Sequence, residues 1–194
     1  AILNRLRNHR PVVLAASTHA GEEALIATAI RTAGACPLIV PRHAERRATV
    51  VADLQAAGFT PILRTAGPLP EELPDNACYI ADTTGELRDW TNLADAVVIG
   101  KSFLAKGGQN PVEAIAARIP VITGPDMSNF EDLVKLLEQA GGISRCTADS
   151  LAETISSVLT DKESTRRRTE AAYAALHVHS GATRRSVELV ETRY

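Results

Sequence analysis

The chain has 194 residues, a length that suits one α/β domain or slightly more. Hydrophobic residues make up 45% and charged residues 23%, as in an ordinary soluble globular fold. The formal net charge of -2 gives no reason to expect nucleic-acid binding, and aromatic residues, at 4%, are too few for base-stacking surfaces. No apolar run reaches the length of a bilayer-spanning helix, and no signal peptide is visible.

The three cysteines, Cys36, Cys78 and Cys146, are far apart and form no C-x-x-C pair. We therefore expect small buried residues of a reducing compartment rather than a zinc site or a disulfide framework. Met127 is the only methionine, whereas the chain starts at Ala1. We expect the sequence to be a piece of a longer protein, cut near a domain boundary.

Strand-like and helix-like segments alternate after a basic stretch, Ala1 to Arg10, that has the character of a linker. The predicted strands are Pro11–Ala16, Pro37–Val40, Phe59–Leu63, Cys78–Ala81, Ala96–Ile99, Pro120–Thr123 and Gly141–Cys146. The predicted helices follow Ser17–Thr18 up to Thr32 and then span Ala44–Ala57, Leu87–Leu93, Val112–Arg118, Asn129–Ala140, Asp149–Leu159, Lys162–Val178 and Ala182–Thr192. The proline-rich stretch from Arg64 to Asn76 is predicted to be a loop.

This alternation predicts an α/β fold in which a parallel sheet is covered by helices on both faces. Ligands of such sheets bind beyond the carboxyl ends of the strands. Five polar clusters follow strands directly and should therefore meet at one edge, whatever the strand order. The clusters are Ser17–His19, Arg42–His43, Asp82–Glu86, Lys101–Glu113 and Gly124–Asn129.

The stretch Gly107-Gly108-Gln109-Asn110-Pro111-Val112-Glu113 is predicted to bind a phosphate. Two glycines let a ligand approach the backbone, while Asn110 and Pro111 suit the cap and first position of a helix with free N–H groups. Alternatively, this is a tight capped turn in which Glu113 only returns a hydrogen bond to the cap. Neither a Walker A motif nor G-x-G-x-x-G is present, so a mononucleotide or a nucleotide sugar fits better than a nucleoside triphosphate.

Arg42 offers a two-pronged donor to a phosphate or carboxylate just after a strand. The alternative is a surface ion pair with Glu45, with His43 as a helix-start residue. Residues Asp82–Glu86 could line a base or sugar pocket, or could form a capping box in which Asp82 or Thr83 pairs with Glu86.

Ser17 or Thr18 can cap the next helix, and Glu22 and Glu23 suit its first turn. A nucleophile-and-base pair of Ser17 and His19 is disfavoured because the G-x-S-x-G elbow is missing, so donors to a ligand phosphate or sugar are the better interpretation. No pair of carboxylates and histidines has a spacing diagnostic of a metal site.

Taken together, the motifs resemble bacterial 3-deoxy-D-manno-octulosonic acid (Kdo) transferases, glycosyltransferase family 30, in their C-terminal half. The resemblance runs from about Val12 to Ala140. It is carried, in order, by Ser17-Thr18-His19-x-Gly21-Glu22-Glu23, Pro41-Arg42-His43-x-Glu45-Arg46, Asp82-Thr83-x-Gly85-Glu86-Leu87, Gly107-Gly108-x-Asn110-Pro111-x-Glu113 and Gly124-Pro125 with Asn129-Phe130.

The resemblance implies one half of a GT-B glycosyltransferase, in which two Rossmann-like domains face each other across a cleft. It implies a linker at residues 1–10, a nucleotide-sugar-binding domain at 11–160 and C-terminal helices at 161–194. The donor would be CMP-Kdo, used without metal or cofactor in an inverting transfer. The missing N-terminal domain would bind the lipid A precursor and supply the general base. The whole enzyme would lie at the cytoplasmic face of the inner membrane, in peripheral contact with it, whereas this segment would be soluble and inactive alone.

The resemblance also implies roles for individual residues. Arg42 would pair with the CMP phosphate or the Kdo carboxylate and support the transition state, and Glu113 would take the ribose hydroxyls. The other members of the implied donor site are Gly107, Gly108 and Asn110 at the phosphate and sugar, Thr84 and Gly85 beside the cytosine, Ser17, Thr18 and His19 in the cleft, and His43, Glu86 and Lys101 around them. The sequence departs from the family, which often has Met, Gly and His where Thr84, Lys101 and Gln109 stand.

Two other functions remain open at this stage: a GT-B enzyme or epimerase that uses a UDP-sugar, and a non-catalytic nucleotide-binding or interaction module. The late helices also carry basic clusters that suit either a membrane surface or, more simply, a solvated helix face. These clusters are Arg166, Arg167, Arg168, Arg184 and Arg185.

Overall fold

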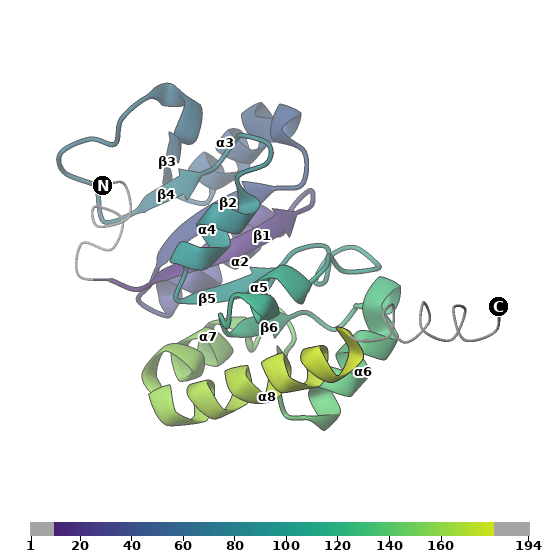
Figure 1. Ribbon diagram of the computed structural model, residues 1–194. Coiled ribbons are helices and arrows are strands. Elements are labelled where there is room, and N and C mark those ends of the chain that lie inside the picture. The colour runs from purple at the N-terminus through teal and green to yellow at the C-terminus, as the bar shows by residue number, and fades with distance from the viewer. Residues whose placement is uncertain (1–9, 181–194) are drawn as a thin grey trace.

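The computed structural model describes residues 10–180, and within them a seven-stranded sheet forms the centre of the fold (Figure 1). The strand order is β3-β4-β2-β1-β5-β6-β7, and every neighbouring pair is parallel. This confirms the predicted α/β class. The strands are β1 (Val12–Thr18), β2 (Cys36–Pro41), β3 (Thr60–Leu63), β4 (Ala77–Ile80), β5 (Ala96–Ile99), β6 (Val121–Thr123) and β7 (Ser144–Arg145).

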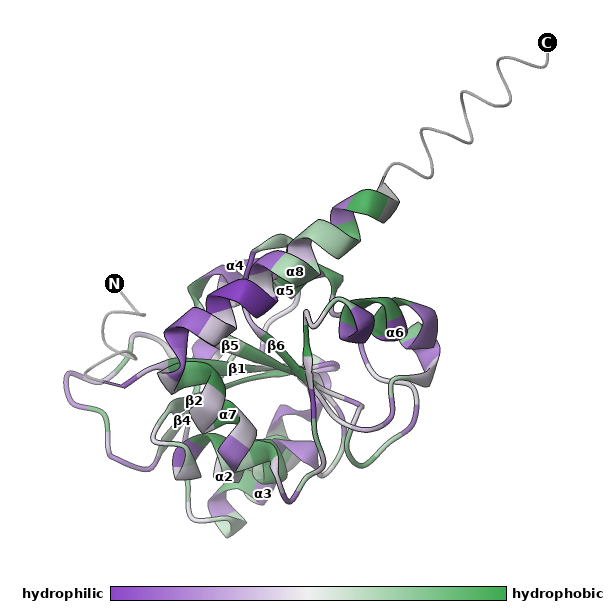
Figure 2. Cartoon of the chain, turned by 90° about the horizontal axis from the view of Figure 1, so that it is seen from below, coloured by the Kyte–Doolittle hydropathy of each residue, from purple (hydrophilic) through white to green (hydrophobic). Residues whose placement is uncertain are grey.

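Helices cover both faces of the sheet, as the alternating pattern predicted (Figures 1 and 2). One face carries α2 (Glu22–Thr32), α3 (Arg47–Ala56) and α7 (Leu151–Thr160). The opposite face carries α4 (Leu87–Leu93), α5 (Val112–Ala116), α6 (Glu131–Gln139) and α8 (Lys162–Ser180). Short 3-10 turns are η1 (Ala44–Arg46), η2 (Arg64–Ala66) and η3 (Ser128–Phe130).

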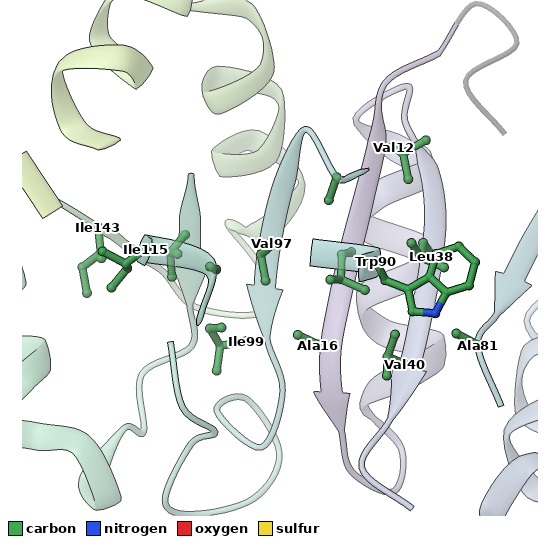
Figure 3. Packing of buried hydrophobic residues seen from close by; sticks show 14 of the residues in the cluster. Val12, Ala16, Leu38, Val40, Ala81, Trp90, Val97, Ile99, Ile115 and Ile143 are labelled. Carbon is green, nitrogen blue, oxygen red and sulfur yellow. The ribbon is translucent and has the colours of Figure 1, made fainter. Parts of the chain in front are cut away.

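The alternation of side chains along β1 divides the core into two layers. Leu14 packs in the layer beneath α4, and its neighbour Val13 packs in the layer beneath α2. Figure 3 shows Trp90 of α4 beside Leu38 in the first layer. The centroid of the Trp90 ring lies 5.5 Å from that of the Tyr79 ring. Because both faces are covered, the central strands are apolar at successive positions, which explains the continuous apolar runs in the sequence.

Helix α8 packs against α5, α6 and α7. Ala172 is buried there, and the Arg118 guanidinium lies 3.9 Å from the centroid of the Tyr173 ring. Arg168 Nη1 donates to Ser144 Oγ at 2.8 Å. The described part of the predicted C-terminal helices is therefore packed on the rest of the α/β fold. The predicted helix from 182 to 192 and the linker at 1–9 lie outside the described residues.

One predicted cap is confirmed and two are wrong. Asn110 Oδ1 accepts from the Val112 N–H at 3.0 Å, as expected for the start of α5. Helix α2 begins instead after Gly21, in the left-handed region at φ 86, and neither Ser17 nor Thr18 caps it. Helix α4 has no side-chain cap, because the Thr83 hydroxyl donates to the Glu86 carboxylate.

The three cysteines are free thiols, buried at Cys36 and Cys78 and half-buried at Cys146. Burial raises the pKa of all three. This confirms their expected role as small packing residues. Among the described residues, no helix combines the length and the hydrophobicity needed to cross a bilayer.

Candidate functional site

The carboxyl ends of the parallel strands lie at one edge of the sheet, so the five polar clusters converge there as predicted. The chain leaves β1 toward β2 on one side and later returns as β5 on the other side. Strand order thus reverses between β1 and β5, the position at which open α/β sheets bind ligands. The loops after these two strands begin at His19 and Gly100.

Arg42 lies at the end of β2 with an exposed side chain that forms no ion pair with the described residues. Its backbone N–H donates to Thr18 O at 3.0 Å, which joins the ends of β2 and β1. The alternative pairing with Glu45 is not formed, because Glu45 Oε1 lies 3.5 Å from His43 Nδ1 instead. The guanidinium therefore remains available to an anionic ligand.

A pocket of about 120 Å³ brings together four of the predicted site residues: Ser17, Arg42, Thr84 and Gly85. They come from three different strand ends, β1, β2 and β4. This small pocket with a guanidinium at its wall suits one ring of a ligand with a charged group beside it. Its remaining lining residues are Val40, Pro41, Ala44, Thr83 and Leu87.

Glu113 lies in a different hollow, of about 350 Å³, between α4 and α5. Arg88 and Asn92 of α4 line it together with Ala116 and Ala117 at the end of α5. Among the described residues, the Asn110 N–H does not donate to Glu113, so the alternative in which Glu113 only completes a cap is not formed. Glu113 and the Arg42 pocket are thus on the same edge without sharing one cavity.

The backbone amides of the glycine loop bond within the protein, whereas some of the described amides at the start of the following helix are free, as expected. Gly107 N donates to Asp126 Oδ1 at 2.8 Å. Gly108 N donates to Lys101 O at 2.9 Å, and Gln109 N donates to Gly100 O at 3.1 Å. These three donors hold the loop itself. In the described chain, the N–H groups of Asn110, Glu113 and Ala114 donate to no protein acceptor, but they open a helix of only five residues.

Both glycines lie against neighbouring side chains and have a backbone conformation that favours glycine. A Cβ at Gly107 would lie 2.8 Å from Asn129 Cγ, and a Cβ at Gly108 would lie 2.9 Å from Met127 Cε. Both residues also adopt positive φ, 114° and 65°, where side chains are disfavoured. The paired glycines are therefore explained by their positive φ, together with the close Asn129 and Met127 side chains, without a ligand.

Other acids at this edge are already paired. Asp82 is buried, accepts from Thr65 N at 3.0 Å and lies 3.8 Å from Arg47 Nη1. Glu86, a predicted site residue, accepts from Thr83 and lies 3.5 Å from Arg64. These contacts fix the loop before α4 and place Thr84 and Gly85 at the pocket.

His19 lies near His43, with ring centroids 6.4 Å apart, and its buried Nδ1 has no partner among the described residues. No hydrogen bond joins Ser17 to His19 in that part of the chain, in agreement with the rejection of a nucleophile-and-base pair. Residues 10–180 contain no cluster of three or more His, Cys, Asp or Glu side chains able to hold a metal ion.

Sequence reasoning missed the burial of Glu22 and Glu23, which are both 0% exposed. The Glu23 carboxylate accepts from Thr18 Oγ1 at 3.0 Å and pairs with Arg46 Nη1 at 2.9 Å. Glu22 instead accepts backbone N–H groups from two loops. A signal was present, because Glu22 is in helical register with the buried Ile26 and with Ile30, four and eight positions later.

A family described as "Glycosyl transferases group 1" matches residues 69–175. The chain belongs to this family. The match covers more than half of the chain and includes β4, β5 and β6 with the loops that follow them.

Two curated proteins match nearly the whole chain, and both are named 3-deoxy-D-manno-octulosonic acid transferase. The protein of Bordetella pertussis is 38% identical over 191 residues, covering 94% of this chain and 44% of that protein. The protein of Haemophilus influenzae is 34% identical over 192 residues, covering 95% of this chain and 44% of that protein. The chain thus spans less than half the length of these relatives.

Among solved structures, the fold is similar to the C-terminal CMP-Kdo binding domain of WaaA from Acinetobacter baumannii. The two are 26% identical with a TM-score of 0.78, over 90% of this chain and 95% of that domain. These matches confirm the resemblance to Kdo transferases. They also confirm the predicted fold, the Rossmann-like half of a GT-B enzyme.

Gly108→Ala should lower the free energy of unfolding more than Gly85→Ala. Alanine in the left-handed region costs about 1–2 kcal/mol at either position. Gly85 faces open space, whereas Gly108 faces Met127, where overpacking adds about 1–3 kcal/mol. Urea unfolding without ligand measures both losses. Equal losses would show that Met127 does not require the glycine.

The stability contributed by Asp126 should disappear in acid. The hydrogen bond from Gly107 N–H, followed by those from Ser128, lowers the pKa of Asp126 from its ordinary value of 3.8. Because the folded pKa is the lower one, the stabilisation is present above about pH 4 and is lost as pH falls through the folded pKa. The difference in unfolding free energy between wild type and Asp126→Asn should therefore narrow below about pH 4. The exposed Asp149→Asn is the control, and a pH-independent difference at Asp126 contradicts the assignment.

Proposed function

We propose that this chain is the donor-binding half of a Kdo transferase and that it binds CMP-Kdo. The observation that carries the proposal is the match to the CMP-Kdo binding domain of WaaA over 95% of that domain. The curated relatives, both named Kdo transferases, support it independently. The lipid A precursor, the general base and a peripheral contact with the inner membrane then belong to the other half of the enzyme.

The geometry supports a donor that lies across the end of the sheet. Cytosine would occupy the pocket bordered by Thr84 and Gly85, with Arg42 at its wall for the phosphate or the Kdo carboxylate. Asn110 and the free amides at the start of α5 would contact the same anionic region, and Glu113 would accept from the ribose hydroxyls. Ser17, Thr18, His19, His43, Glu86 and Lys101 complete the proposed surroundings.

In the proposed inverting transfer, an acceptor hydroxyl attacks the anomeric carbon of Kdo. The bond from that carbon to the phosphate oxygen breaks, the electron pair goes to CMP, and the hydroxyl proton goes to the base of the other half. Negative charge grows on the departing phosphate, and the unpaired Arg42 guanidinium is suited to stabilise it. Because Arg42 supplies that charge, the proposal requires no metal ion.

CMP should bind the 194-residue chain more tightly than UMP or UDP. Arg42→Ala should weaken CMP binding by about tenfold to a hundredfold, the range expected for a hydrogen bond between charged groups. Glu113→Gln should also weaken it. Arg166→Ala, exposed on α8, is the matched control and should leave affinity unchanged.

Isothermal titration calorimetry measures these affinities. Preference for UDP would favour an enzyme that uses a UDP-sugar. Unchanged affinity in both Arg42→Ala and Glu113→Gln would mean that the motifs are only structural, as in a non-catalytic module.

The chain alone should transfer no Kdo to lipid A precursor, because the proposed general base and acceptor site lie in the other half. The assay supplies CMP-Kdo and lipid A precursor and follows CMP release and product mass. A full-length Kdo transferase serves as the positive control. Detectable transfer by the 194-residue chain would place the catalytic base within it.

A further inference from the structure

Glu22, at the first position of α2, joins the loops that follow β1 and β5. Its Oε2 accepts from His19 N at 3.1 Å and from Lys101 N at 2.5 Å. Its Oε1 accepts from Phe103 N at 3.0 Å and from Leu104 N at 3.4 Å. One carboxylate thus connects the two loops at the point where the strand order reverses.

This carboxylate is 0% exposed and has no cationic partner among the described residues. Arg46 pairs with the neighbouring Glu23 and not with Glu22. Backbone N–H dipoles therefore compensate the buried charge of Glu22. Loss of the carboxylate would leave the part-buried N–H donors of Lys101 and Phe103 without their acceptor, so the loop could not keep its conformation without loss of free energy.

The conformation that Glu22 holds is transmitted to the glycine loop. Lys101, whose N–H donates to Glu22, accepts from Gly108 N through its carbonyl. Gly100 O accepts from Gln109 N, so the start and the end of the loop are bonded to each other. Asn110 follows directly. The position of Asn110 therefore depends on how the carboxylate holds Lys101.

The backbone is strained on both sides of this contact. Ser17 and Lys101 adopt φ 56° and 58°, a left-handed conformation that costs non-glycine residues about 1–2 kcal/mol each. The two loops also touch, because a Cβ at Gly100 would lie 2.6 Å from Ser17 O. Strained residues persist where the surroundings determine their conformation, and they cluster at ligand sites.

We infer that Glu22 is a positioning residue of the donor site. It fixes Lys101 and the β5–α5 loop against the end of β1. Ser17, Lys101 and Asn110 therefore have the positions needed for binding already in the ligand-free protein. This inference rests on the proposed donor site. Glu22 would not touch the ligand itself. It would act on binding through the two loops that it holds in place.

The test compares Glu22→Gln with Ile26→Val in the 194-residue chain. Glu22→Gln keeps the shape of the side chain but places an NH2 group against backbone N–H donors. It should weaken CMP binding by about tenfold or more, an effect equivalent to the loss of one good contact. The backbone amide hydrogens of residues 101, 103 and 104 should exchange with deuterium faster than in wild type. Ile26→Val, a mild core change on the same helix, should alter neither CMP affinity nor those amides.

Glu22→Asp covers the case in which Glu22→Gln does not fold. It retains the charge, but its side chain is one methylene shorter, so the carboxylate no longer reaches the loop. It should therefore weaken CMP binding and speed up deuterium exchange at the same amides. CMP affinity equal to wild type in a folded Glu22 variant overturns the inference, as does an equal loss in Ile26→Val.

If wild type does not bind CMP, the proposed function itself fails. Amide exchange then decides separately whether Glu22 holds the loop: faster exchange in the variant supports that role, and unchanged exchange overturns it.

Discussion

The parallel pairing of β1 with β5 is the constraint on which the candidate site depends. Val13 pairs with Ala96 and Ala16 with Ile99, so both strands end side by side at the centre of the sheet. Their following loops must share a narrow space, and Gly100 is necessary there because Ser17 O and Thr18 Cα leave no room for a Cβ. Ser17 and Lys101, which have left-handed backbone, closely follow the paired residues, and Ser17 also lies where the β1–β2 register shifts.

Charge pairing at the same edge leaves an imbalance that favours an anionic ligand. Glu23 pairs with Arg46, Asp82 with Arg47 and Glu86 with Arg64. Glu45 lies beside His43 and does not pair with Arg42. Within residues 10–180, the Arg42 side chain therefore forms no ion pair with a carboxylate. One unpaired guanidinium at the wall of the small pocket is consistent with a ligand that carries a phosphate or carboxylate group.

The sequence predicted the sheet and its ligand-binding edge because these follow from local patterns. Apolar runs such as Val12–Ala16, each followed by a polar cluster, determine strand positions, and parallel pairing brings the clusters together. Helix starts were less predictable. Thr18 is a good capping residue in isolation, but a tertiary contact directs its hydroxyl to Glu23. Likewise, two adjacent glutamates suggested a favourable first turn, and only the packing of α2 against the β5 loop buries them.

The glycine loop shows that residues of a shared sequence motif can serve the fold as well as a ligand. Gly107 and Gly108 belong to the pattern shared with Kdo transferases, yet their missing side chains accommodate Asn129 and Met127, and their amides bond within the protein. A sequence cannot distinguish a glycine required by a ligand from one required by a neighbouring side chain, since both positions exclude a Cβ. The groups that the fold leaves unsatisfied are more informative. The Arg42 guanidinium and the amide N–H of Asn110 lie at the carboxyl edge with no protein partner among the described residues, so binding energy for a donor can come from them without breaking a contact of the fold.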